Sequence, residues 1–137
     1  MIFRIYCDGG ARGNPGPAGI GVVVNDEKDN LIHKFGKRIG ATTNNVAEYT
    51  AVVEALTYLG EKIRFEKGDK IAFHLDSELV VSQLNGIYKV KNEKLRLLLW
   101  KVREKEAGFS MPISYQHIPR EENHLADAMV NEALDSA

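Results

Sequence analysis

One short segment near the start of the chain limits the fold more than any other. Asp8 ends an apolar run at residues 2–7 and leads straight into a turn rich in glycine and proline. A second apolar run follows at residues 20–24, so the segment predicts two antiparallel strands joined by a hairpin connection. An ionised aspartate at a buried strand end is costly unless a metal ion or another partner neutralises it. The simpler alternative is that Asp8 only forms an Asp-Gly turn.

The composition limits the class of protein. The chain has 137 residues, 44% of them apolar and 27% charged, which is typical of one soluble globular domain over residues 1–137. The single cysteine, Cys7, excludes an internal disulfide and lies in an apolar strand, where we expect it to be buried. This cysteine usage fits a reducing compartment, and we predict a cytoplasmic location. No segment is long enough to span a membrane, so no membrane partner is expected.

The hydrophobic periodicity predicts the element order βββαβααβα. The predicted strands cover residues 2–7, 20–24, 31–39, 70–76 and 112–118. The predicted helices cover residues 46–59, 78–84, 92–107 and 121–134. The first three strands should form an antiparallel meander, and the later two need crossover connections and should pair in parallel. The expected fold is therefore α/β, with a five-stranded mixed sheet flanked by helices.

Four carboxylates fall where they could share one site. Asp8 and Asp76 each close a predicted strand, Glu48 lies in the first turn of the first long helix, and Asp127 lies in the second turn of the last helix. Ligands of α/β sheets gather outside strand ends, so these side chains could meet there. Four carboxylates would repel one another without cations, and magnesium prefers such hard oxygen ligands.

Each of these carboxylates also has a simpler interpretation. Glu48 could form a capping box with Asn45, three residues earlier. Asp76 could cap the following helix together with Ser77. Asp127 could be an ordinary solvated helix residue. The metal site is therefore a hypothesis about the four residues as a set.

The charge is unevenly distributed. The net charge of −1 does not indicate a general nucleic-acid-binding domain, which usually has a clear basic excess. The richest basic segment contains Lys89, Lys91, Lys94, Arg96, Lys101, Arg103 and Lys105. It is either a local contact for phosphates or a solvated helix face in which Glu93, Glu104 and Glu106 balance the cations. We expect Trp100, in the same helix, to belong to the core, the alternative being a platform on which bases stack.

The motifs, in this order, closely resemble those of ribonuclease H type 1. The matching segments are Asp-Gly-Gly at 8–10, Gly-Asn-Pro-Gly at 13–16, Thr-Thr-Asn-Asn-Val-Ala-Glu at 42–48, Asp-Ser at 76–77, and residues 117–127, which run from His117 through Asn123 to Asp127. The resemblance covers nearly the whole chain, and the predicted element order is that of the ribonuclease H-like fold.

The resemblance implies an endonuclease that cleaves the RNA strand of an RNA–DNA hybrid and leaves 5′-phosphate and 3′-hydroxyl ends. It implies that two Mg²⁺ ions, with Mn²⁺ as a substitute, are bound by Asp8, Glu48, Asp76 and Asp127. It also implies that His117 shuttles protons or helps the product leave, the alternative being a structural loop histidine. The other histidines match no family position and are expected to be structural or on the surface.

The resemblance implies the substrate contacts as well. Gly9 and Gly10 would let the backbone approach the RNA, because a Cβ atom would block close contact. Asn14 and Asn45 would lie near 2′-hydroxyls, the groups that distinguish RNA from DNA. Thr43 and Asn92 would grip a phosphate of the DNA strand.

The sequence departs from many relatives at several positions. Residues 83–92 leave no room for the basic protrusion that follows the second helix in those proteins, Ala41 replaces an arginine, and Glu78 replaces a glutamine. We therefore expect this protein to bind hybrids more weakly, and with more sensitivity to salt, than relatives that carry the basic protrusion.

Two alternatives stay open at this point. The enzyme could also cut double-stranded RNA, which shares the A-form minor groove of the hybrid. The chain could instead be a non-catalytic module that binds RNA or hybrids. We expect a monomer in either case.

Overall fold

The computed structural model describes residues 1–136 and contains one five-stranded mixed sheet, with strand order β3-β2-β1-β4-β5. The strands are β1 (Ile2–Ala11), β2 (Gly16–Asn25), β3 (Leu31–Thr42), β4 (Lys70–Leu75) and β5 (Ile113–His117). The first three strands pair antiparallel, whereas β4 pairs parallel with both β1 and β5. The predicted fold class and strand directions are therefore confirmed.

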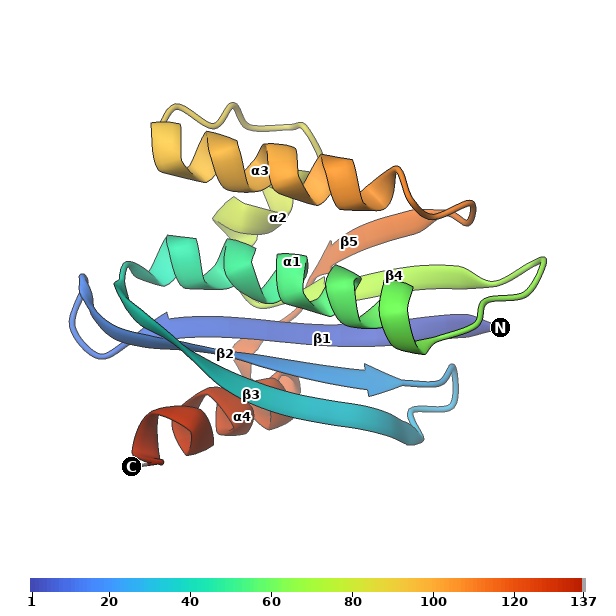
Figure 1. The fold of residues 1–137 in the computed structure, drawn as a ribbon, viewed down its shortest axis with the longest axis horizontal. Helices are drawn as coiled ribbons and strands as arrows, with labels where there is room; N and C mark the ends of the chain where they lie inside the picture. Colours follow the sequence, from blue (N-terminus) through green and yellow to red (C-terminus); the bar gives the residue numbers. More distant parts are fainter. Residues whose placement is uncertain (137) are drawn as a thin grey trace.

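Helices cover both faces of this sheet (Figure 1). They are α1 (Asn44–Lys62), α2 (Glu78–Leu84), α3 (Glu93–Glu106) and α4 (His124–Asp135), with a short 3₁₀ helix, η1, at Arg120–Glu122. The helices α1, α2 and α3 lie on one side, and α4 lies alone on the other side against β1, β2 and β3. No helix within residues 1–136 combines the length and the apolar character needed to cross a bilayer.

The main core lies between β1 and α1. Phe3, Ile5 and Cys7 alternate along β1 and are buried in the same cluster as the apolar face of α1. Alternate residues of a strand share one face, which is why these three side chains meet the helix. The Cys7 thiol is free and fully buried, as predicted.

The first strand is longer than the sequence predicts. Its pairing with β2 continues through Asp8↔Gly21 to Ala11↔Ala18, so Asp8 lies inside β1 and the prediction that it closes the strand is wrong. The glycine-rich segment lacks apolar side chains, but its backbone N–H and C=O groups can still pair in the ladder. The tight turn is reduced to residues 12–15.

The helix starts also differ from the predictions. Thr43 is the N-cap of α1 and accepts a hydrogen bond from the backbone N–H of Val46, which rules out the alternative of a capping box between Asn45 and Glu48. Glu48 therefore lies in the second turn of α1, and not in the first turn as predicted. Because η1 interrupts the last predicted helix, α4 begins at His124 and places Asp127 in its first turn.

Trp100 does not belong to the core, and that prediction is wrong. Its side chain is 70% exposed, whereas Leu95 and Val102 of the same helix are buried. At 100° per residue, position 100 lies well outside the stripe that contains positions 95 and 102. The apolar character of Trp100 therefore says less about its location than its phase in the helix.

Candidate active site

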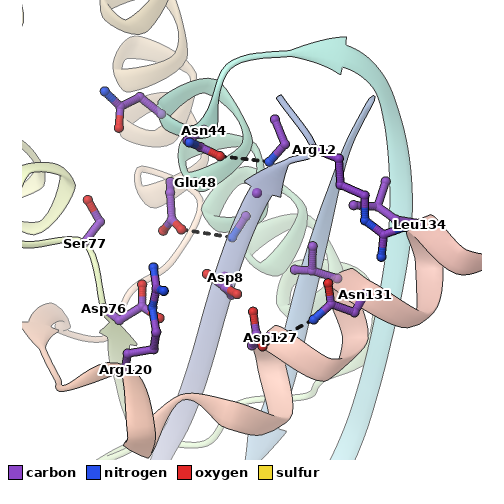
Figure 2. A pocket seen from close by; sticks show the side chains of 15 residues that line it. Asp8, Arg12, Asn44, Glu48, Asp76, Ser77, Arg120, Asp127, Asn131 and Leu134 are labelled. Atoms are coloured by element: carbon purple, nitrogen blue, oxygen red, sulfur yellow. Dashed lines mark hydrogen bonds between the residues drawn. The ribbon is translucent and has the colours of Figure 1, made fainter. Parts of the chain in front are cut away.

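A polar pocket of about 380 Å³ opens at the edge of the sheet where β1 and β4 separate. The last residue pair of the β1–β4 ladder is Cys7↔Leu75, so Asp8 and Asp76 are the next residues of the two diverging strands. Glu48 reaches the pocket from α1 and Asp127 from α4 (Figure 2). All four predicted carboxylates therefore line one pocket.

Three of the four carboxylates form a tight cluster. Oxygen atoms of Asp8, Glu48 and Asp76 all lie within 4.8 Å of one another. Asp127 is exposed at the rim, where its Oδ2 accepts a 3.3 Å hydrogen bond from Nδ2 of Asn131. The pocket thus has a partly buried acidic centre and a fourth carboxylate at its mouth.

The pKa values of two carboxylates in the cluster, Asp8 and Glu48, are raised. Burial is the main cause that raises the pKa of Asp8 to about 7; the charges of Asp76 and Asp127 add to it, and a hydrogen bond with Glu48 opposes it. The pKa of Glu48 is raised well above its usual range, first by burial and then by the charge of Asp8. Full ionisation of the cluster at neutral pH is therefore unfavourable unless positive charge enters the pocket.

Glu48 is held firmly but only by one of its oxygens. The backbone N–H of Gly9 donates a 3.1 Å hydrogen bond to Oε1, while Oε2 is buried and has no partner within residues 1–136. A Cβ atom on Gly9 would lie 2.2 Å from the backbone carbon of Ala47, so glycine is required there for α1 to approach β1. An unpartnered buried carboxylate oxygen facing two other carboxylates fits a cation ligand.

Asn123 supports the cluster from behind. Its side chain is only 1% exposed, and its Nδ2 donates to the carbonyl oxygen of Cys7 (2.8 Å) and to Oδ2 of Asp76 (3.3 Å). These bonds tie the start of α4 to the two strands that carry Asp8 and Asp76. The sequence contained Asn123 within a matching segment, but no pattern assigned it this role.

The residues implied as substrate contacts divide into two groups. Gly9, Gly10 and Asn45 line the pocket. The remaining three make structural contacts outside the lining. Asn14 Oδ1 accepts from the backbone N–H of Asn44, Thr43 caps α1, and Asn92 caps α3 by accepting from Leu95 N–H at 3.1 Å. The predicted contacts of these three residues with the substrate stay predictions.

Sequence reasoning missed several residues that line the pocket. Asn44 lines it and accepts a 2.9 Å hydrogen bond from the backbone N–H of Ala11 through its Oδ1. Arg12 and Arg120 also line it, and Arg12 forms an ion pair with Asp135 at 2.7 Å. An arginine in a polar loop carries no periodic signal, so only the folded chain places these cations beside the carboxylates.

His117 does not line the pocket. It is the last residue of β5, pairs with Leu75 in the parallel ladder, and is exposed. The predicted role of His117 in proton transfer or product release stays a prediction. His74 is buried and stacks on Tyr6 at 4.8 Å between ring centroids, as expected for a structural histidine.

Comparison with known proteins finds a matching family and relatives that are ribonucleases H. A family described as reverse transcriptase-like matches residues 6–133. The chain is 41% identical to the ribonuclease HI of Halobacterium salinarum over 132 residues, which is 96% of this chain and 64% of that protein. It is 36% identical to the ribonuclease H of Thermosynechococcus vestitus, covering 94% of this chain and 73% of that one.

A solved structure is similar over almost the whole fold. The crystal structure of LC11-RNase H1 in complex with an RNA/DNA hybrid is 47% identical, has a TM-score of 0.90, and the match covers 97% of this chain and 96% of that chain. The chain spans less than two thirds of the length of the Halobacterium relative. The extent of these matches, together with the shared strand order, shows that the chain belongs to the ribonuclease H family, in its type 1 branch.

Proposed function

We propose that this protein is an endoribonuclease that hydrolyses the RNA strand of RNA–DNA hybrids with two Mg²⁺ ions, for which Mn²⁺ can substitute. The observation that carries the proposal is the cluster of Asp8, Glu48 and Asp76, in which one oxygen of Glu48 is buried without a partner. The hybrid bound by the 47% identical LC11-RNase H1 supports the choice of substrate. We further propose that the protein acts as a monomer in the cytoplasm.

Asp8, Glu48, Asp76 and Asp127 would hold the metal ions. When bound, divalent ions activate water and stabilise the charge that develops on a phosphate during hydrolysis. The acidic centre alone would repel a phosphate, so the carboxylates need the cations before the substrate can approach. Asp127, at the exposed rim, can enter or leave a coordination sphere more easily than the buried Glu48.

The rigid parts of the site come from the chain itself. The N–H of Gly9 fixes one oxygen of Glu48, and Asn123 fixes one oxygen of Asp76, so each carboxylate keeps its other oxygen outside these bonds. Catalytic groups held within narrow limits lose little entropy when the substrate binds. Asn123 is therefore a positioning residue.

The rim of the pocket supplies groups for recognising RNA. Asn44 and Asn45, in the first turn of α1, carry amide donors and acceptors that can pair with 2′-hydroxyls. Arg120 offers a cation for a phosphate on the β5 side. His117, exposed at the end of β5, would meet the leaving product if the strand moves out along that edge.

A panel of nucleic acids tests the substrate class. We expect metal-dependent cutting of the RNA strand in an RNA–DNA hybrid and none in single-stranded RNA or double-stranded DNA, measured on gels with end-labelled strands. Comparable cutting of double-stranded RNA would show that the protein recognises the A-form shape of the duplex and does not require a DNA strand. Well-folded protein that cuts none of them in Mg²⁺ or Mn²⁺ would contradict the proposal and favour a binding module.

Metal binding should also change the thermal stability in a pH-dependent way. Because Asp8 and Glu48 have raised pKa values, the folded state binds more protons than the unfolded state, so the free energy of unfolding falls as the pH rises from about 4 towards 7. Mg²⁺ that binds only the folded protein offsets this loss, and at a concentration ten times its Kd it adds about 1.4 kcal/mol to the free energy of unfolding. Calorimetry should therefore show a larger Mg²⁺-induced rise in Tm at pH 7.5 than at pH 5. An equal rise at both values would contradict binding at the cluster.

A further inference from the structure

A second hollow lies between α1 and the middle of α3, close to the carboxylate pocket. It measures about 400 Å³, and its lining includes Val46, Lys94, Leu97, Trp100, Lys101 and Glu104. These residues of α3 recur at spacings of three and four, which places them on one face of the helix. We call this hollow the α1–α3 groove.

The groove exposes more apolar surface than the fold requires. Trp100 is 70% exposed and Leu97, one turn earlier, is 62% exposed, and the half-buried Val46 continues the strip onto α1. Single exposed apolar residues are common on proteins, but a contiguous strip rimmed by charged groups is typical of an interaction surface. Neither side chain contributes to the core cluster of the domain.

The charge around the groove indicates an anionic partner. The lining itself has two cations, Lys94 and Lys101, and one carboxylate, Glu104. It belongs to a segment, residues 89–105, that holds seven cations and two carboxylates, although the whole chain has a net charge of −1. Lys94 and Lys101 form no ion pair within residues 1–136, whereas Arg103 is occupied by Glu106. Aromatic and aliphatic side chains set between free lysines suit a sugar–phosphate backbone better than an acidic protein surface, because the rings can pack on sugars and bases.

The groove also continues from the proposed substrate site. Asn45 and Glu48 of α1 line the carboxylate pocket, and Val46, between them in sequence, lines the groove. The two helices lie side by side on the same face of the sheet (Figure 1). Trp100 is eight residues beyond the N-cap Asn92, or about 12 Å along α3. A strand that leaves the pocket over the start of α1 can therefore reach Trp100 within a few nucleotides, at about 3.4 Å each.

We infer that the α1–α3 groove binds the sugar–phosphate backbone of the hybrid beyond the cut. Lys94 and Lys101 contact phosphates, and Trp100 with Leu97 packs against the sugar and base faces. This inference rests on the proposed function and extends its substrate site. The inference explains why Trp100 is exposed and why Lys94 and Lys101 have no ion pair within the described part of the chain. A solvated helix face would explain the lysines but not the exposed tryptophan.

Trp100 is the only tryptophan in the chain, so its fluorescence reports on the groove directly. In an Asp8→Asn background with Mg²⁺, we expect the emission to change on addition of a hybrid of about 18 base pairs, and to change less with one of about 8. Trp100→Ala should raise the Kd of the long hybrid about fivefold or more, measured by anisotropy of labelled hybrid, and Trp100→Phe should restore most of the affinity. Replacing Lys94 and Lys101 together by glutamine should reduce the slope of log Kd against log salt by about 2.

Matched controls lie at the opposite end of the sheet. Lys28→Gln, in the turn between β2 and β3, and Ile32→Ala, at the exposed start of β3, should leave the Kd and the salt slope unchanged. If the parent protein cuts hybrids but Trp100 emission and the Trp100→Ala affinity do not change, this inference is wrong and the proposed function stands. A parent protein that neither cuts nor binds any hybrid overturns both. Sedimentation that shows self-association lost in Trp100→Ala would assign the groove to a second copy of the chain and overturn the inference.

Discussion

Replacing Asp8 by asparagine is expected to stop cleavage and to stabilise the metal-free protein at the same time. The substitution removes a metal ligand from the centre of the cluster, so the rate of hybrid cleavage should fall by at least about 10³-fold. It also removes a buried charge whose pKa is raised to about 7, so the free energy of unfolding in chelator at pH 7.5 should rise by about 1–3 kcal/mol. Urea denaturation and a gel assay measure the two effects.

A loss of cleavage together with a gain in stability would identify the cluster as functional, because removing a structural carboxylate would lower the stability. Glu61→Gln, at an exposed position near the end of α1, serves as the control and should change neither quantity. If Asp8→Asn destabilises the metal-free protein, the carboxylate has a structural partner and the electrostatic account of the pocket is wrong.

Gly21→Ala should cause a large loss of stability. A Cβ atom at this position would lie 2.0 Å from the backbone oxygen of Ala126, in the first turn of α4. Because backbone cannot move aside as a flexible side chain does, we expect α4 to shift and the free energy of unfolding to fall by about 3 kcal/mol or more. Asp127 and Asn123 move with that helix, so cleavage should fall as well.

Gly10→Ala is the matched control for this prediction. Gly10 lies in the neighbouring strand on the face towards α4, but its Cβ would meet only a side-chain carbon of Val130, at 3.8 Å. We expect its free energy of unfolding to stay within about 1 kcal/mol of the parent value. Equal losses in the two variants would show that β-strand propensity, not the approach of α4, accounts for the effect at Gly21.

The strand and helix pattern was largely predictable because most of the chain follows simple periodicities. The alternation of Phe3, Ile5 and Cys7 and the bounds of α2 follow directly from the positions of apolar residues and of the end signal Asn85-Gly86. The extension of β1 past Asp8 was not predictable in this way, because glycines carry no hydrophobic signal and pair only through their backbone. The core position predicted for Trp100 is wrong because its angular position in α3 lies away from the stripe that contains the buried Leu95 and Val102.

The candidate site shows a similar division. The motif spacing predicts all four carboxylates, and the fold brings them to one pocket. The contacts that hold them in place were not predictable, since Gly9 with Glu48 and Asn123 with Asp76 are separated by 39 and 47 residues along the chain. Such contacts depend on the register of β1 against β4 and on the docking of α1 and α4. The expected weaker and more salt-sensitive hybrid binding stays a prediction.

The most direct test of the central claim is the identity of the product ends after Mg²⁺-dependent cleavage. A hybrid labelled on both strands would be incubated with the protein in Mg²⁺ or in chelator, and the products treated with phosphatase and analysed by mass. The account predicts cutting of the RNA strand only, only with Mg²⁺, to give 5′-phosphate and 3′-hydroxyl ends, because metal ions held by the carboxylates would activate water to attack the phosphate. Cleavage in chelator, or 2′,3′-cyclic phosphate ends from attack by the RNA's own 2′-hydroxyl, would contradict it.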